Sequence, residues 1–145
     1  MNEARAAASA ACLRELVAML ASLRPERVSG DYAYCELPAG APIPDLAICS
    51  FREPEGTTVI LPAAVAVAAG LPVRFEAAWI TLGLDSDLGA IGLTAAVSSA
   101  LADAGIACNV VAALRRDHLF VPASRAADAV QVLLNLRQTA GTTKV

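Results

Sequence analysis

The sequence is poor in the residues that carry most metal and nucleic-acid chemistry. It contains a single histidine, His118, and its four cysteines include no C-x-x-C pair, so it lacks the ligand spacing of a zinc site. Aromatic residues make up only 4% of the chain, which leaves few rings to stack on single-stranded bases. We therefore expect no structural metal and no nucleic-acid partner.

Charge is also scarce and nearly balanced. Eleven basic residues stand against 14 acidic ones, for a formal net charge of −3, and no basic run exceeds Arg115-Arg116. A nucleic-acid partner would require a basic patch. Hydrophobic residues reach 57% against 17% charged residues, a balance typical of a chain that folds around an apolar core. The length of 145 residues fits one compact domain or two small ones that share a core.

One long uncharged segment, Gly56 to Val73, reaches the length of a short membrane-spanning helix. A short β-rich strand followed by a short helix with proline in its first turn accounts for the same residues. We expect this second arrangement, and hence no membrane partner, because proline and glycine interrupt the segment at Pro62, Gly70 and Pro72.

The N-terminal segment does not have the unbroken apolar core of a secretory signal, because Arg14 and Glu15 lie within it. A cytoplasmic protein is therefore expected. In that compartment thiols stay reduced, and free cysteine is among the residues most often buried. We expect four free and mostly buried thiols, at Cys12, Cys35, Cys49 and Cys108.

In the first half of the chain, apolar residues recur at intervals of three and four within residues 2–23, which predicts an amphipathic helix that Pro25 stops. Strands are predicted at 31–37, 46–51 and 57–61, and a second helix at 62–69. Gly70-Leu71-Pro72 marks the expected boundary between an N-terminal half, residues 1–72, and a C-terminal half, residues 73–145.

The second half reads β-α-β-β-α, which is most of a split βαβ, ferredoxin-like unit without its last strand. Either strands of the first half complete this sheet, or each half carries an incomplete sheet closed by its neighbour. The predicted elements are a strand at 75–84, a turn at 85–89, a helix that ends before Gly105, strands at 106–114 and 118–121, a helix at 124–137 and a frayed tail at 140–145.

Three segments of the second half carry a resemblance to a known family: Gly92 to Ile106, Asn109-Val-Val, and Asp117-His-Leu-Phe-Val-Pro122. They resemble the C-terminal ACT module shared by aspartate-kinase regulatory domains and the cytosolic arginine sensors. Residues 48–56 and 68–72 look like the N-terminal half of small bacterial stand-alone tandem ACT proteins. The resemblance runs from about residue 31 to 132 and implies an α+β fold of two ferredoxin-like ACT halves with antiparallel sheets.

The resemblance implies a regulatory protein, often a homodimer, that binds a small effector such as an amino acid beside the strand-to-helix loop. A ligand carboxylate needs backbone N–H groups, and glycines at a helix start, here Gly89 and Gly92, allow a close approach. A side-chain oxygen of Asn109 or Asp117 would accept a hydrogen bond from the ligand ammonium. The predicted site comprises Asp87, Gly89, Gly92, Leu93, Asn109, Leu114 and Asp117.

Other interpretations stay open. The two glycines can mark nothing more than a tight turn, and Asn109 can satisfy backbone groups within the sheet. Residues 112–116, Ala-Ala-Leu-Arg-Arg, stand where relatives carry two hydroxyls and a ring, which favours a structural dimerisation module with a decayed pocket. Asp117-His118 has no nucleophile nearby in sequence, so we expect neither a catalytic residue nor a cofactor.

Acidic and aromatic residues around the long strand have simpler expected roles. Asp85 and Asp87 form a poor metal site and are expected to cap the helix that follows. Phe75 and Trp79 are expected in the core or at a subunit interface.

Overall fold

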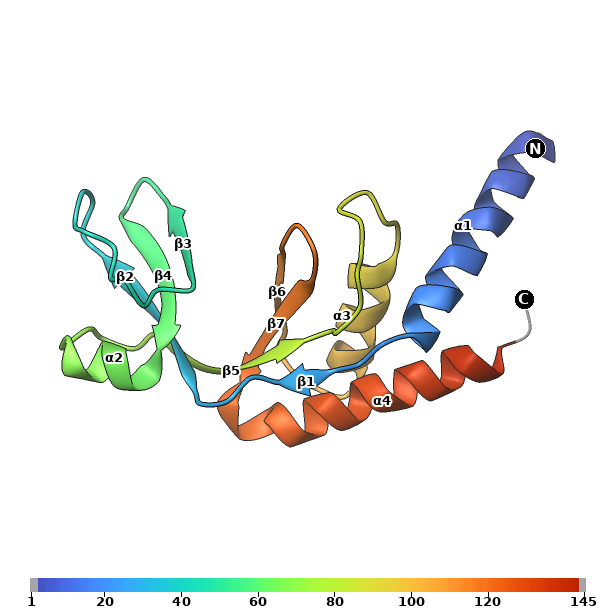
Figure 1. Cartoon of the computed structure of the whole chain (residues 1–145). Helices are drawn as coiled ribbons and strands as arrows, with labels where there is room; N and C mark the ends of the chain where they lie inside the picture. The colour runs from blue at the N-terminus through green and yellow to red at the C-terminus, as the bar shows by residue number, and fades with distance from the viewer. Residues whose placement is uncertain (1–2, 144–145) are drawn as a thin grey trace.

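The computed structural model describes residues 3–143. One antiparallel sheet of seven strands runs through the molecule, with helices on one of its faces (Figure 1). The elements in chain order are α1 (Glu3–Ala21), β1 (Glu26–Arg27), β2 (Tyr32–Leu37), β3 (Cys49–Arg52), β4 (Thr57–Pro62), α2 (Ala63–Ala68), β5 (Phe75–Thr81), α3 (Leu93–Asp103), β6 (Asn109–Ala112), β7 (Asp117–Pro122), the 3-10 turn η1 (Ala123–Arg125) and α4 (Ala126–Thr142).

Strand β5 joins the two halves of the sheet, whose order is β3-β4-β2-β5-β7-β6. On one side of β5 lies β7, and on the other lie β2 and then β1, one after the other. Arg27 pairs with Ile80 and Tyr32 with Ala77, so residues 28–31 bulge between the two strands.

The second half therefore receives its missing strand from the first half. β1 pairs with the end of β5 and closes the group β6-β7-β5-β1, while β5 itself closes the group β3-β4-β2-β5. Of the two arrangements left open by the sequence, the structure has the second, in which each half carries an incomplete sheet that a strand of the other half closes. The predicted α+β class with antiparallel, ferredoxin-like halves is confirmed.

The two halves repeat the same hairpin with an offset of 60 residues, from Cys49 to Asn109 and from Thr57 to Asp117. They differ in what precedes that hairpin. In the second half α3 lies between β5 and β6, whereas in the first half only the loop of residues 38–48 lies between β2 and β3.

Most of the apolar core lies under the helices of the second half. Leu101 of α3, Leu119 of β7 and Leu133 of α4 are fully buried there. Leu20 near the end of α1 and Leu23 just after it are buried in the same cluster. A smaller cluster lies between the first-half strands and α2. α1 thus packs on α4 and α3, although its sequence belongs to the first half.

The opposite face of the sheet carries the aromatic residues. Tyr32 and Phe120 are buried there, and Tyr34, Phe75 and Trp79 are half-buried around them. Phe75 and Trp79 were expected in the core or at a subunit interface, and their side chains are only half-buried.

Several predicted elements end earlier or later than the sequence indicated. The strand predicted at 75–84 ends at Thr81, because its partner β7 begins at Asp117. The strand predicted from residue 106 starts at Asn109, because the N–H of Ile106 bonds to Leu101 at the end of α3. The tail predicted to fray from residue 140 continues α4 to Thr142, with Ala140 buried, and residues 144–145 lie outside the described residues.

The uncharged segment from Gly56 to Val73 forms β4 and α2, as predicted. Within the described range 3–143, no helix combines the length and the apolar character needed to cross a membrane.

Candidate functional site

The loop between β5 and α3 is held at both ends by the core. Leu82 and Leu84 are buried at its start, and Leu93 is buried at the first position of α3. Gly92 precedes the helix with φ +94°, a left-handed conformation that glycine adopts without strain. The acidic residues of the loop, Asp85 and Asp87, are exposed between these anchors.

The two loop aspartates do not cap α3, contrary to the sequence-based expectation. Oδ1 of Asp87 instead accepts a 2.7 Å hydrogen bond from the N–H of Gly89, which closes a short turn inside the loop. No side chain in the described part of the chain caps the N-terminus of α3. The first N–H groups of that helix therefore keep their capacity to bind an anion.

Asp117 begins β7 and is one of the few buried polar residues, with 7% of its surface exposed. Its Oδ2 accepts a 2.6 Å hydrogen bond from the hydroxyl of Ser86, and its backbone oxygen accepts one from the N–H of Leu82. These two bonds fasten the loop to the hairpin of β6 and β7.

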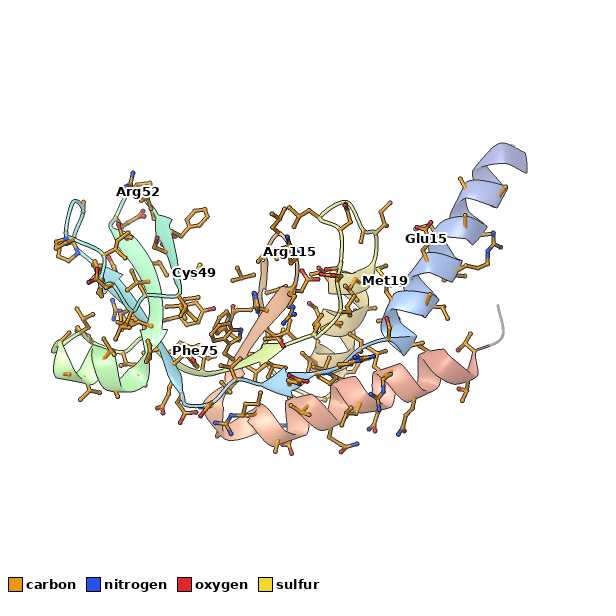
Figure 2. All side chains as sticks on the ribbon, viewed as in Figure 1. Glu15, Met19, Cys49, Arg52, Phe75 and Arg115 are labelled. Carbon is orange, nitrogen blue, oxygen red and sulfur yellow. The ribbon has the colours of Figure 1, made fainter. Side chains whose placement is uncertain are left out.

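Two shallow cavities lie on either side of this loop. One, of about 340 Å³, lies between residues 85–87 and the hairpin residues Leu114 and Arg115. The other, of about 470 Å³, lies between the loop and α1 at Glu15 and Met19. Figure 2 shows Arg115 on the β6–β7 hairpin and Glu15 and Met19 on α1, on opposite sides of the loop.

Most of the predicted site residues gather around these cavities. Asp87 lines both of them, Leu114 lines the first and Gly89 the second. Asp117 reaches the loop through Ser86. Gly92 lies against α1, since a Cβ built on it would be 3.0 Å from Cδ2 of Leu16.

Asn109 does not join this group, contrary to our expectation. It pairs with Phe120, three positions along β7 from Asp117, which corresponds to about 10 Å. Because side chains alternate along a strand, an odd separation also places Asn109 and Asp117 on opposite faces of the sheet. The strand pairing thus separates Asn109 from the loop.

Sequence reasoning did not assign Ser86, Arg115, Glu15 or Met19 to the site. Ser86 lies between two aspartates, and serine and aspartate are common in turns, so the sequence indicated a turn there and no binding role. Glu15 and Met19 approach the loop because α1 packs on the second half, which no local pattern in α1 reveals.

Asp117 and His118 are neighbours in sequence but lie on opposite faces of the sheet. Nδ1 of His118 accepts a 3.0 Å hydrogen bond from Nε1–H of Trp79, while Asp117 bonds to Ser86 on the helix side. Burial lowers the pKa of His118, with a further lowering by Arg116 that opposes the raising effect of Asp117. The pair therefore does not form a hydrogen-bonded dyad.

The four cysteines are free thiols. Cys35 is buried and the other three are partly buried. Burial raises the pKa of Cys108 to about 11 and also raises that of Cys35. Within residues 3–143, no group of three histidine, cysteine, aspartate or glutamate side chains is arranged to hold a metal ion.

Comparison with protein families identifies the domains. Two models of the ACT domain match the chain, over residues 11–78 and 74–135. The chain belongs to the ACT-domain family. The two matches overlap at residues 74–78, at the beginning of β5, the strand that both halves of the tandem ACT protein share.

Solved structures support the same fold. The tandem ACT protein is 38% identical to a Vibrio cholerae protein of unknown function described as a possible transport protein, with a TM-score of 0.77 over 88% of this chain and 99% of that one. The aspartokinase α and β subunits match at 8% identity and a TM-score of 0.57, over 79% of this chain and 97% of that one. The regulatory subunit of Thermus flavus aspartate kinase matches at 13% identity and a TM-score of 0.50, over 79% of this chain and 95% of that one. No curated protein matches the sequence.

Proposed function

We propose that this tandem ACT protein is a regulatory module that binds a small effector, an amino acid, beside the loop of residues 85–92, and that it is not an enzyme. The observation that carries the proposal is the first cavity, of about 340 Å³, which is lined by Asp85, Asp87 and Arg115. Both signs of charge line this space, as a zwitterion requires. None of the three side chains forms an ion pair within the described part of the chain.

Each group of the effector has a partner in this arrangement. The guanidinium of Arg115 binds the α-carboxylate, and the carboxylates of Asp85 and Asp87 accept hydrogen bonds from the ammonium group. Asp117 adds a negative charge beneath the loop and holds the loop through Ser86. Three residues hold the backbone between the cavity and the start of α3. The N–H of Gly89 closes the turn with Asp87, Gly92 adopts the left-handed conformation before the helix, and Leu93 is buried in the core.

The proposal includes a cytoplasmic homodimer. Strands β3 and β6 end the sheet, and each offers one unpaired edge in the described fold. Such edges are covered by pairing with another chain or by charge and bulges. The exposed apolar residues Phe51 on β3 and Leu114 beside β6 favour cover by a second copy. Four free thiols fit a reducing compartment.

A thermal-shift screen of the full chain against the twenty amino acids tests this function. A ligand at 100 times its dissociation constant stabilises the folded state by about 2.7 kcal/mol. Arg115→Gln and Asp87→Asn are expected to abolish the shift, and Asn109→Ala, outside the site, to preserve it. A shift that survives both site variants would place the effector elsewhere.

A second function is favoured by one specific observation. Ala112, Ala113 and Leu114 form an apolar rim on the hairpin, and Leu114 is 79% exposed. An apolar rim suits a contact between protein chains better than recognition of a charged ligand. If no amino acid stabilises the protein while it remains a dimer, the structural dimerisation module is the better description.

A further inference from the structure

The first half of the molecule contains a cavity of its own. About 390 Å³ of space lies between the loop Ala39 to Ile43 and the hairpin residues Arg52, Glu53, Gly56 and Thr57. Small-molecule sites in proteins commonly have volumes of roughly 300–1,000 Å³. This cavity is therefore large enough for a small metabolite.

The cavity exists because the first half has no counterpart of α3. The loop of residues 38–48 takes the place of that helix, and only its small residues Ala41 and Ala47 pack on the first-half core. Two prolines, Pro42 and Pro44, restrict the loop. Small side chains on one wall leave the space above the hairpin unfilled.

Thr57, which lines the cavity, carries a hydroxyl without a protein partner in the described part of the chain. Thr57 has 7% of its surface exposed, and its hydroxyl takes part in no hydrogen bond among residues 3–143. In the other half the corresponding residue is Asp117, whose carboxylate is bound by Ser86. Thr57 pairs with Leu37, and Asp117 bonds to Leu82 through its backbone; Ser86 lies four residues after Leu82, but the residue four positions after Leu37 is Ala41, which has no hydroxyl to form that bond. The Thr57 hydroxyl is left for a ligand.

A positive charge lies beside this hydroxyl. Arg52 is the register partner of Thr57, so both side chains project from the same face of the hairpin as direct cross-strand neighbours. Figure 2 shows Arg52 near the tip of the β3–β4 hairpin. Its guanidinium forms no ion pair in the described structure, whereas the neighbouring Glu53 accepts a hydrogen bond from Thr58.

We propose that this first-half cavity binds a small organic carboxylate, separately from the effector site proposed for the second half. The guanidinium of Arg52 binds the carboxylate through paired N–H donors, a geometry for which arginine is suited. The hydroxyl of Thr57 bonds to a second polar group close to the carboxylate, such as an α-hydroxyl or α-amino group. The two sites together make the protein a receptor for two small molecules.

Calorimetric titration of the full chain tests this site with L-lactate, succinate and the twenty L-amino acids as probes. Arg52→Gln and Thr57→Val each alter one named group with little change of shape. Arg74→Gln is the matched control, because Arg74 lies beside β2 but outside this cavity and loses the same charge. At least one probe is expected to bind with an affinity that falls about tenfold or more in Arg52→Gln and in Thr57→Val, and that stays unchanged in Arg74→Gln.

The second-half variant Arg115→Gln separates this proposal from the proposed effector site. A probe whose binding is lost in Arg52→Gln and kept in Arg115→Gln supports the first-half site, whatever the fate of the other. Binding that is kept in Arg52→Gln and in Thr57→Val, or the absence of any binding by the probes at millimolar concentration, overturns it. Unfolding curves of each variant identify any loss of binding that comes from misfolding, and Arg52, which is exposed, is expected to leave them unchanged.

Discussion

The hydroxyl of Ser86 donates a 2.6 Å hydrogen bond to Oδ2 of Asp117, 31 residues away, and thereby ties the loop after β5 to the first residue of β7. Asp117 is buried, so its carboxylate depends on this partner. The bond joins the loop and the β6–β7 hairpin, which together border the first cavity. It therefore connects the stability of the second half with the position of the loop.

Asp117→Asn and Ser86→Ala are expected to differ in their effects. Asparagine still offers an oxygen to Ser86, so Asp117→Asn should change the free energy of unfolding little, while the lost charge beneath the loop weakens effector binding by less than the about 1.5–3 kcal/mol of a direct charged hydrogen bond. Ser86→Ala leaves the buried carboxylate without its partner and should destabilise the fold by about 1–3 kcal/mol. Urea unfolding and calorimetric titration measure the two quantities. Equal stability of Ser86→Ala and the wild type would contradict this account of the bond.

Gly92→Ala is expected to destabilise the protein more than Gly105→Ala. Both glycines have positive φ, so both variants suffer the strain of a left-handed alanine, about 1–2 kcal/mol. Only at Gly92 does a new Cβ meet a neighbour, Cδ2 of Leu16 at 3.0 Å, whereas no atom lies within 4 Å at Gly105. Thermal unfolding of the two variants gives the difference directly. A side chain at Gly92 thus perturbs the packing of α1.

The sequence predicted the kinds of element well because each depends on local patterns. Apolar periodicity marked α1 and α3, and the hairpins were bounded by polar turns. It did not predict β1, because Glu26 and Arg27 are two exposed polar residues whose pairing depends only on where β5 lies. The packing of α1 on the second half was missed for the same reason, since the apolar face of a helix does not indicate which element it packs against.

The site was only partly predictable. The sequence predicted that Asp87, Gly89 and Asp117 lie near one another, because local signals indicated the strand-to-helix loop and the hairpin that carry them. Asn109 was misplaced because its position relative to Asp117 depends on the register of β6 with β7, which pairs Asn109 with Phe120 and which no local pattern specifies. Strand parity then puts Asn109 on the aromatic face of the sheet.

Acidification is expected to destabilise the protein through His118. The pKa of His118 is lowered in the folded state, chiefly by burial, so the unfolded chain binds a proton more readily. The contribution of this group is fully present above the ordinary histidine pKa of about 6.5 and is lost as the pH falls through the lowered, folded-state value. Protonation also removes the Nδ1 acceptor used by Trp79.

The melting temperature of the wild type should therefore fall between pH 7.5 and pH 5.5. His118→Asn keeps an acceptor for the indole N–H and removes the titration, so its melting temperature should vary less over the same interval. Parallel pH profiles for the two proteins would contradict the assignment of the pH dependence to His118.

Two of the four thiols, Cys35 and Cys108, are expected to react more slowly with a thiol reagent than the other two. Cys35 is buried, and burial raises its pKa, so it should stay unreactive in the native protein at pH 8. Cys108 should react slowly, because burial raises its pKa to about 11 and little thiolate is present. Titration in denaturant should count four thiols. A count below four in a sample protected from air would indicate a disulfide or a modified cysteine.

The dimer is expected to depend on one of two unpaired strand edges, at β3 or at β6. Light scattering at micromolar concentration should give twice the 14.8 kDa mass of the single chain. Phe51 on β3 is 70% exposed and Leu114 beside β6 is 79% exposed, so lysine at either position should leave folding intact and oppose association at that edge. If β6 forms the interface, Leu114→Lys becomes monomeric and Phe51→Lys stays dimeric, and the reverse result assigns the interface to β3. A wild-type mass that remains at 14.8 kDa on concentration would rule out the dimer, and with it the structural dimerisation module as a function.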